Sequence, residues 1–236
     1  MRWIRDATRR FPHRPYYEAT ELDAICERII TAFLSERYGR VCFPIATEDL
    51  KILIEQIAGD LDVYADLTTE GITVEGLTTF IGGEKPSIKV AAWLTEYPSS
   101  ENRLRTTLAH ELGHAVFHQV LADRYRALFE ARRDSLTIRC HRKTMLDAPT
   151  SNWIEWQAGY ASGAFLMPET RLREQFHLLV IGDAENPGLH MESVVGRHLI
   201  RRVQAAFRVS EDAARVRLKQ HGYLLDHPRT RDFSRA

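Results

Sequence analysis

The chain has 236 residues, of which 44% are hydrophobic and 27% charged, and its 32 Lys and Arg are balanced by 32 Asp and Glu. This is the composition of a globular protein with its own core, and zero net charge gives no general attraction to nucleic acid or to an anionic membrane. No apolar run reaches the ~18 residues that span a bilayer, and the Arg-rich N-terminus has no apolar signal segment. Three widely spaced cysteines, Cys26, Cys42 and Cys140, argue against a disulfide framework and favour the cytoplasm.

The predicted elements begin with an aperiodic N-terminal stretch and continue with two helices. Thr20 is the expected N-cap of the first helix, whose apolar residues recur at i, i+3 and i+4 until Gly39 ends it. A second helix is expected to begin at Thr47 and to end at Gly59. Short β-prone pieces separated by Gly and Pro then predict a small sheet with a hairpin. These pieces are residues 61–67, 72–81 and 87–94. The last of them is expected to offer an edge on which an extended substrate can add as a strand.

The rest of the chain is predominantly helical by pattern. A long helix is expected from Ser99 or Ser100 to about Leu121. The further helices are expected at residues 151–166, 169–179, 191–207 and 210–221. We therefore expect a basic N-terminal arm over 1–18, a core over 19–180 with a charged insertion at 122–150, and a C-terminal helical region over 181–236.

The most informative motif is His110-Glu111-Leu112-Gly113-His114, inside the long helix. Residues i and i+4 share one face of a helix, so two imidazoles there can both reach one Zn²⁺ at ~2.0–2.1 Å. Glu111 is turned by ~100° from His110, so it need not be a ligand, yet it can reach water at the metal. A pattern with three fixed positions also arises by chance. Gly113 favours the zinc interpretation, because a mid-helix glycine destabilises a helix by about 1 kcal/mol relative to alanine and indicates a close approach of another element there.

A third ligand has two candidates. His118 continues the i+4 row, but it lies about 12 Å along the axis from His110, too far to close one tetrahedron, so we expect a cleft-facing or satisfied polar residue. Glu155 is the better candidate, since its helix is rich in small residues that let helices approach closely. The alternative is that Glu155 is an ordinary surface carboxylate.

Three blocks in this order resemble the ImmA/IrrE family of zinc metallopeptidases. They are RTTLAHELGHAVFH at 105–118, E-x-Q-A-x-Y-A…LMP from Glu155 to Pro168, and F-x-VS-x-x-A-x-x-x-RL from Phe207. The resemblance implies a gluzincin-like site in which His110, His114 and Glu155 bind zinc and Glu111 is the catalytic base. It also implies a protein substrate, since members of the family typically act on helix-turn-helix repressors or antitoxins, often in mobile elements or stress responses.

Two departures from the family pattern concern the site. The second block usually has Asn where this chain has Gly159, so any support that this Asn gives to the metal is missing or comes from elsewhere. The interval before Glu155 is long and contains Cys140, which is either an ordinary thiol or a latent, inhibitory zinc ligand. His118 and Tyr160 are candidates for contacts with the substrate or the transition state.

The sequence thus predicts an α+β, zincin-like fold, with a small, mostly antiparallel sheet beside a helical bundle and a zinc cleft between them. The predicted function is a zinc-dependent endopeptidase that acts on a helix-turn-helix repressor or antitoxin, with Mn²⁺ or Fe²⁺ as alternative ions. One rival is a DNA-binding protein, based on the basic run 197–202 and the block 207–222. Another is a regulator that sequesters a repressor without cleaving it. No membrane association is expected.

Overall fold

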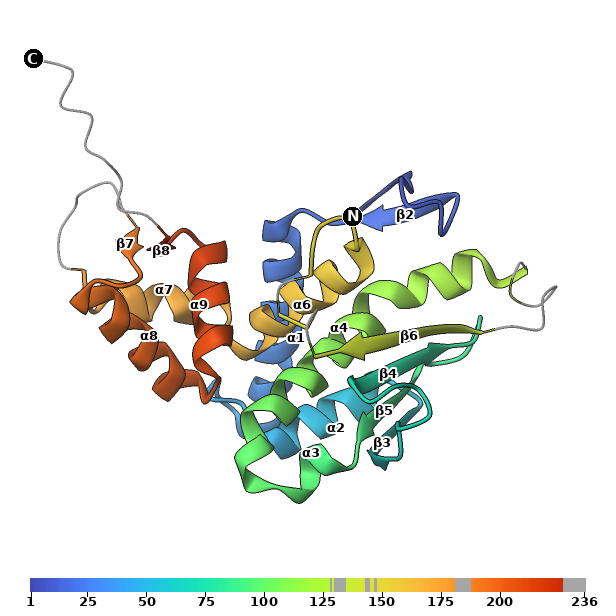
Figure 1. The fold of residues 1–236 in the computed structure, drawn as a ribbon, viewed down its shortest axis with the longest axis horizontal. Helices are drawn as coiled ribbons and strands as arrows, with labels where there is room; N and C mark the ends of the chain where they lie inside the picture. The colour runs from blue at the N-terminus through green and yellow to red at the C-terminus, as the bar shows by residue number, and fades with distance from the viewer. Residues whose placement is uncertain (128, 130–134, 143–144, 147, 181–187, 227–236) are drawn as a thin grey trace, which may run out of the picture.

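The structure is a computed structural model that describes residues 1–127, 129, 135–142, 145–146, 148–180 and 188–226 (Figure 1). Its mixture of helices with small sheets confirms the predicted α+β class. The C-terminal helices lie to one side of the sheet and the central helices (Figure 1). Within the described residues, no helix combines the length and the apolar character needed to cross a membrane.

The N-terminal segment is a β-hairpin, in which β1 (Arg2–Arg5) pairs antiparallel with β2 (His13–Tyr16). Buried Asp6 closes its loop by accepting hydrogen bonds from the Phe11 amide and the Trp153 indole. The segment is therefore a docked hairpin and not the extended arm that was predicted. Aperiodic sequence concealed it because the stabilising contacts come from one carboxylate and a residue far along the chain.

The first two helices follow the prediction closely. α1 (Ala19–Tyr38) begins with a capping box between Glu18 and Glu21, so its start lies just before the predicted Thr20. α2 covers Thr47–Ile57 and begins where expected. Their apolar faces contribute to the main core.

The central sheet has the strand order β3-β5-β4-β6, and only β3 and β5 run parallel, so the sheet is mostly antiparallel as predicted. Its strands are β3 (Asp60–Ala65), β4 (Val74–Phe80), β5 (Ser87–Ala91) and β6 (Leu136–His141). The expectation of a free edge at 87–94 was wrong, because β5 is hydrogen-bonded on both sides and the chain then forms the short α3 (Trp93–Glu96). In the described sheet, β6 is the outermost strand beside β4.

Part of the predicted insertion at 122–150 is thus a strand of the sheet. Leu136, Ile138 and Cys140 alternate on the buried side of β6, and this period of two was hidden by the charged residues between and around them. Arg132, Arg133 and Lys143 of the same segment lie outside the described residues.

Two helices carry the HExxH motif and the block that contains Glu155. The turn η1 (Pro98–Ser100) leads into α4 (Glu101–Arg124), and α4 packs closely against α6 (Trp153–Leu166). A Cβ added at Gly113 would lie 3.1 Å from both the Ala158 carbonyl oxygen and the Ala161 Cβ. This confirms that the glycine in the motif marks a close approach.

The C-terminal region shares the main hydrophobic core and is also joined to it by a buried ion pair. Its elements are α7 (Glu169–His177), β7 (Leu189–His190), α8 (Val194–Phe207), α9 (Glu211–Gln220) and β8 (Leu224–Leu225). Arg217 on α9 is 1% exposed and binds Asp23 on α1 and the Met167 carbonyl. None of the three cysteines forms a disulfide, in agreement with the sequence.

Candidate metal centre

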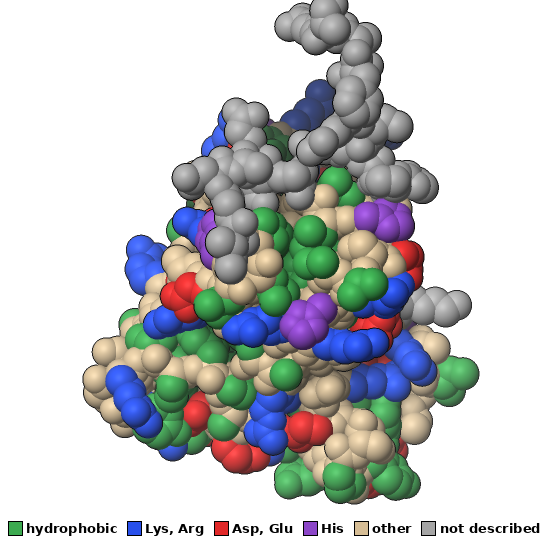
Figure 2. All heavy atoms as spheres, turned by 90° about the vertical axis from the view of Figure 1, so that its left-hand side faces the viewer, with side chains coloured by type: hydrophobic (Ala, Val, Ile, Leu, Met, Phe, Trp, Pro, Cys, Tyr) green, Lys and Arg blue, Asp and Glu red, His purple; other side chains and the backbone are tan. Residues whose placement is uncertain are grey.

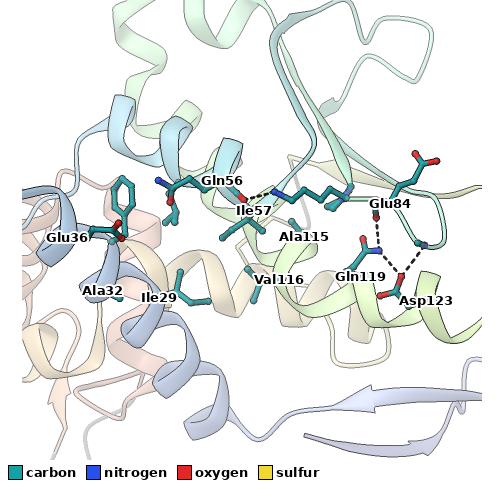
Figure 3. Close-up of a pocket in the computed structure, with 15 residues that line it drawn as sticks. Ile29, Ala32, Glu36, Gln56, Ile57, Glu84, Ala115, Val116, Gln119 and Asp123 are labelled. Atoms are coloured by element: carbon teal, nitrogen blue, oxygen red, sulfur yellow. Dashed lines mark hydrogen bonds between the residues drawn. The ribbon is translucent and has the colours of Figure 1, made fainter.

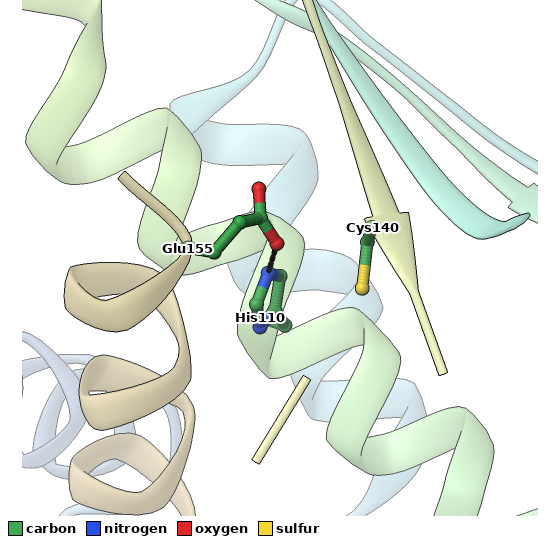
Figure 4. Close-up of side chains that lie close together, drawn as sticks. All are labelled: His110, Cys140 and Glu155. Carbon is green, nitrogen blue, oxygen red and sulfur yellow. Dashed lines mark hydrogen bonds and ion pairs between the residues drawn. The ribbon is translucent and has the colours of Figure 1, made fainter. Parts of the chain in front are cut away.

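The centre is built on α4, which carries His110, Glu111 and His114 at full burial. Leu108 and Leu112 also lie inside the main core, so the helix buries an apolar face and a polar face together. The polar face is covered by α6 on one side and by β4 and β6 on the other (Figure 4). The histidines are therefore enclosed between packed elements.

Three donor atoms converge from the two helices. His110 Nε2 lies 3.1 Å from His114 Nε2 and 3.2 Å from Glu155 Oε2, and His114 Nε2 lies 3.4 Å from Glu155 Oε1. A tetrahedral Zn²⁺ with bonds of ~2.0–2.1 Å requires donors about 3.3 Å apart. Each separation is close to that spacing, and the two imidazoles approach different oxygens of the Glu155 carboxylate. The two rings and the carboxylate therefore fit a tetrahedral ion with one further coordination position.

The charges of this group depend on one another. Burial alone would raise the pKa of the Glu155 carboxyl, but the adjacent imidazoles of His114 and His110 hold that pKa well below its usual value. Burial lowers the pKa of His114 despite the neighbouring carboxylate of Glu155. Burial opposes the protonation of His110 as well, but the hydrogen bond and the charge of Glu155 raise the pKa of His110. The site thus combines a carboxylate anion with one imidazole that favours its neutral form and one that must give up a proton when a metal ion binds, since coordination requires deprotonated ligands.

Glu111 is held beside this triangle by the sheet. Thr78 of β4 donates a hydrogen bond of 2.5 Å to Glu111 Oε2, whereas Glu111 Oε1 is buried without a hydrogen-bond partner among the described residues. A Cβ at Gly76 would lie 2.2 Å from that same oxygen, so only glycine leaves room for the carboxylate. Burial raises the pKa of Glu111 to about 7, against the opposing effects of His110 and the Thr78 hydrogen bond.

Cys140 also faces the centre (Figure 4). One ligand atom each from His110, Cys140 and Glu155 lies within 4.8 Å of the other two. Burial, followed by the negative charge of Glu111, raises the pKa of the Cys140 thiol well above its usual value. The structure therefore places a neutral, enclosed thiol next to the donor triangle.

Of the two candidates for substrate contacts, the structure brings only His118 to the centre. Its ring is fully buried and hydrogen-bonded at both nitrogens, to His114 and to Gln157. Tyr160 instead donates a 2.7 Å hydrogen bond to Asp23, and the Arg217 guanidinium lies over its ring. Tyr160 follows Glu155 by five positions, which places it on another face of α6.

Gly159, where the family pattern has Asn, makes room for a backbone group. A Cβ at this position would lie 2.8 Å from the Met145 carbonyl oxygen. The same oxygen lies 3.3 Å from His110 Nδ1 and can accept a hydrogen bond from Nδ1–H. In this chain the support for His110 therefore comes from a main-chain carbonyl packed against the glycine.

Thr78, Gln157 and the Met145 carbonyl were missed by reasoning from the sequence. Gln157 could have been found, because a polar residue in the first turns of an apolar helix, close to a proposed ligand, needs a hydrogen-bond partner. Thr78 and Met145 carried none, since their roles depend on strand register and on the path of a loop.

A groove of about 810 Å³ lies elsewhere (Figure 3). It is lined by parts of α1, α2, the turn before β5, and by Ala115, Val116 and Gln119 of α4. These α4 positions lie on the helix face turned away from His110 and His114. The groove is therefore separate from the metal centre.

A buried HExxH helix with a carboxylate from a neighbouring helix is the ligand pattern found in zinc metallopeptidases. Comparison with known families agrees: the sequence profile of the M78 peptidases, described as the IrrE N-terminal-like domain, matches residues 93–219. The match covers more than half of the chain, so the chain belongs to this family and the resemblance to ImmA/IrrE proteins is confirmed. No curated protein and no solved structure matches the chain.

Proposed function

We propose that the protein is a zinc-dependent endopeptidase in which His110, His114 and Glu155 hold the ion and Glu111 is the catalytic base. The observation that carries this proposal is the donor triangle beside a carboxylate with one unpaired oxygen. Two imidazoles and a carboxylate also suit Mn²⁺ or Fe²⁺, but a tetrahedral spacing of donors favours zinc.

When bound, zinc supplies a Lewis acid for the peptide carbonyl and for the attacking water. Glu111 has a pKa of about 7, which lets it take a proton from that water and return it to the leaving amine near neutral pH. Thr78 holds Oε2 of the base, which leaves Oε1 for the proton. The described sheet ends in β3 on one side and in β6 on the other, and β6 is the edge strand whose Cys140 faces the metal centre, so we propose it as the strand to which an extended substrate adds.

A helix-turn-helix repressor or antitoxin is the substrate class that we propose, and this rests on family membership. Direct DNA binding has less support, because acidic side chains lie among the basic ones on the face that Figure 2 shows. On α8 and α9, for example, Arg197 pairs with Glu192 and Arg215 pairs with Glu211. Sequestration of a repressor without cleavage differs from our proposal in leaving the repressor's mass unchanged.

The direct test is hydrolysis of a peptide mixture of known composition. The zinc-loaded protein is incubated with peptides from a digested bacterial proteome, and new N-termini are identified by amine labelling and mass spectrometry. We expect new termini that disappear after treatment with a chelator and return with added zinc. The endopeptidase proposal would be contradicted if neither the zinc-loaded wild type nor a zinc-loaded Cys140→Ser variant produced new termini.

We further propose that the Cys140 thiolate can act as a fourth ligand that keeps the enzyme latent. Its sulfur faces the donor triangle, and zinc binds thiolates strongly. Replacing the thiol by a hydroxyl removes the stronger ligand, so Cys140→Ser is expected to raise the rate of cleavage by roughly tenfold, which is ~1.4 kcal/mol of released inhibition.

The control for this variant is Cys26→Ser, since Cys26 is equally buried but lies in the main core. A rate that does not change in Cys140→Ser, with zinc content equal to that of the wild type, would show that Cys140 is an ordinary thiol.

A further inference from the structure

A chain of buried polar groups leads from the N-terminal hairpin to His114. Gln157 Nε2 donates to the carbonyl oxygen of Pro15 at 3.1 Å, and Gln157 Oε1 lies 3.0 Å from His118 Nε2. His118 Nδ1 then lies 2.9 Å from His114 Nδ1. Gln157 is 1% exposed and both histidines are fully buried, so water does not compete for these hydrogen bonds.

The Pro15 carbonyl, at one end of this series of hydrogen bonds, sets the direction of all the others. A proline carbonyl only accepts, so the amide nitrogen of Gln157 must face Pro15 and its oxygen must face His118. That oxygen also only accepts, so the proton of a neutral His118 sits on Nε2. His118 Nδ1 is then an acceptor, and the proton between the two rings belongs to His114 Nδ1.

We propose that His118 and Gln157 are positioning residues that hold His114 in its Nδ1–H tautomer and thereby direct the Nε2 lone pair at the metal. This inference rests on the proposed zinc site. His114 Nε2 is the atom that lies 3.1 Å from His110 Nε2 in the donor triangle. The hydrogen-bond partner of a ligand histidine is usually a carboxylate, carbonyl or water. Here the partner of His114 is a second histidine, whose own tautomer is fixed by the Gln157 amide and the Pro15 carbonyl.

Through the Pro15 carbonyl, this series of hydrogen bonds connects β2 of the N-terminal hairpin to the metal centre. His110 receives its support separately, from the Met145 carbonyl at its Nδ1. The two ligand histidines are therefore oriented by two different backbone carbonyls, one directly and one through Gln157 and His118. Both arrangements leave Nε2 free of a proton, as coordination requires.

The wild-type protein provides the first test. Two-dimensional ¹⁵N NMR of the metal-free, histidine-labelled full chain near neutral pH reports which nitrogen of each neutral ring carries the proton, with His114→Gln and His118→Gln used for assignment. We expect Nδ1–H for His114 and Nε2–H for His118. The opposite tautomer at either residue would overturn the proposal.

The second test removes the side-chain amide of Gln157, which fixes the tautomers of His118 and His114. In Gln157→Leu we expect a mixture of His114 tautomers and a zinc affinity weaker by about 10–100-fold, the usual effect of losing an outer partner of a metal ligand. Gln119→Leu is the matched control, because Gln119 lies on the face of α4 opposite to that of His110 and His114 and binds Glu84 and Asp123. Comparable thermal stability of the two variants shows that both fold.

The outcomes separate this inference from the proposed function. A Gln157→Leu protein with wild-type zinc affinity and a pure His114 Nδ1–H tautomer would overturn the positioning role. If both positioning readouts behave as expected but no peptide is cleaved, the hydrogen-bond chain stands and the endopeptidase proposal fails.

Discussion

Glu111→Gln is expected to remove peptide hydrolysis while the metal stays bound. The amide has the size of the carboxylate but cannot take a proton from the attacking water, and general-base catalysis contributes typically 10²–10⁴-fold. Glu111 lies outside the triangle formed by His110, His114 and Glu155, so the ligand set is intact. We therefore expect kcat to fall by at least about 10²-fold at an unchanged zinc stoichiometry.

The measurement pairs cleavage kinetics with metal analysis by mass spectrometry. Glu101→Gln is the control, since Glu101 is an exposed residue in the first turn of the same helix. Thr78 can still donate to the amide oxygen of the variant, so little change in folding is expected. Wild-type cleavage by Glu111→Gln would remove Glu111 from its proposed role.

The donor triangle could be anticipated because it follows from helix geometry and one packing argument. The spacing of His110 and His114 fixes a common face without any knowledge of the fold. The small residues around Glu155 predicted a close helix pair, and the contacts at Gly113 confirm it. Helix periodicity therefore indicates the two histidines, whereas Glu155 stayed open against a surface carboxylate until the family resemblance favoured it as a ligand.

The remainder of the site depends on contacts that have no period. Cys140 faces the centre because β6 pairs with β4 in a register that sets Cys140 opposite Gly76. The strand itself was hidden by charged residues on its outer side. Pro15 contacts Gln157 because it lies in a hairpin whose loop is closed by Asp6 and Trp153, residues far apart in the sequence. Such long-range register cannot be read from one chain segment at a time.

Glu155→Ala is expected to cost the protein its metal. The carboxylate supplies one of three protein donors and the only negative charge among them, so its loss leaves two neutral imidazoles to hold a dication. The affinity should fall by more than the 10–100-fold typical of outer partners. Titration of the metal-free proteins against a chromophoric chelator would measure the difference, and metal analysis of the wild type would identify zinc, manganese or iron.

The control is Glu169→Ala, which removes a carboxylate from the start of α7 where it pairs with Arg173. Cleavage activity should be absent from Glu155→Ala and normal in this control. A Glu155→Ala protein that keeps one tightly bound ion would mean that another group completes the site. Cys140 is the group placed to do so, because its ligand atom already lies within 4.8 Å of that of His110. The double variant with Cys140→Ser would then decide between them, because loss of the ion only in the double variant makes the thiol a resident ligand.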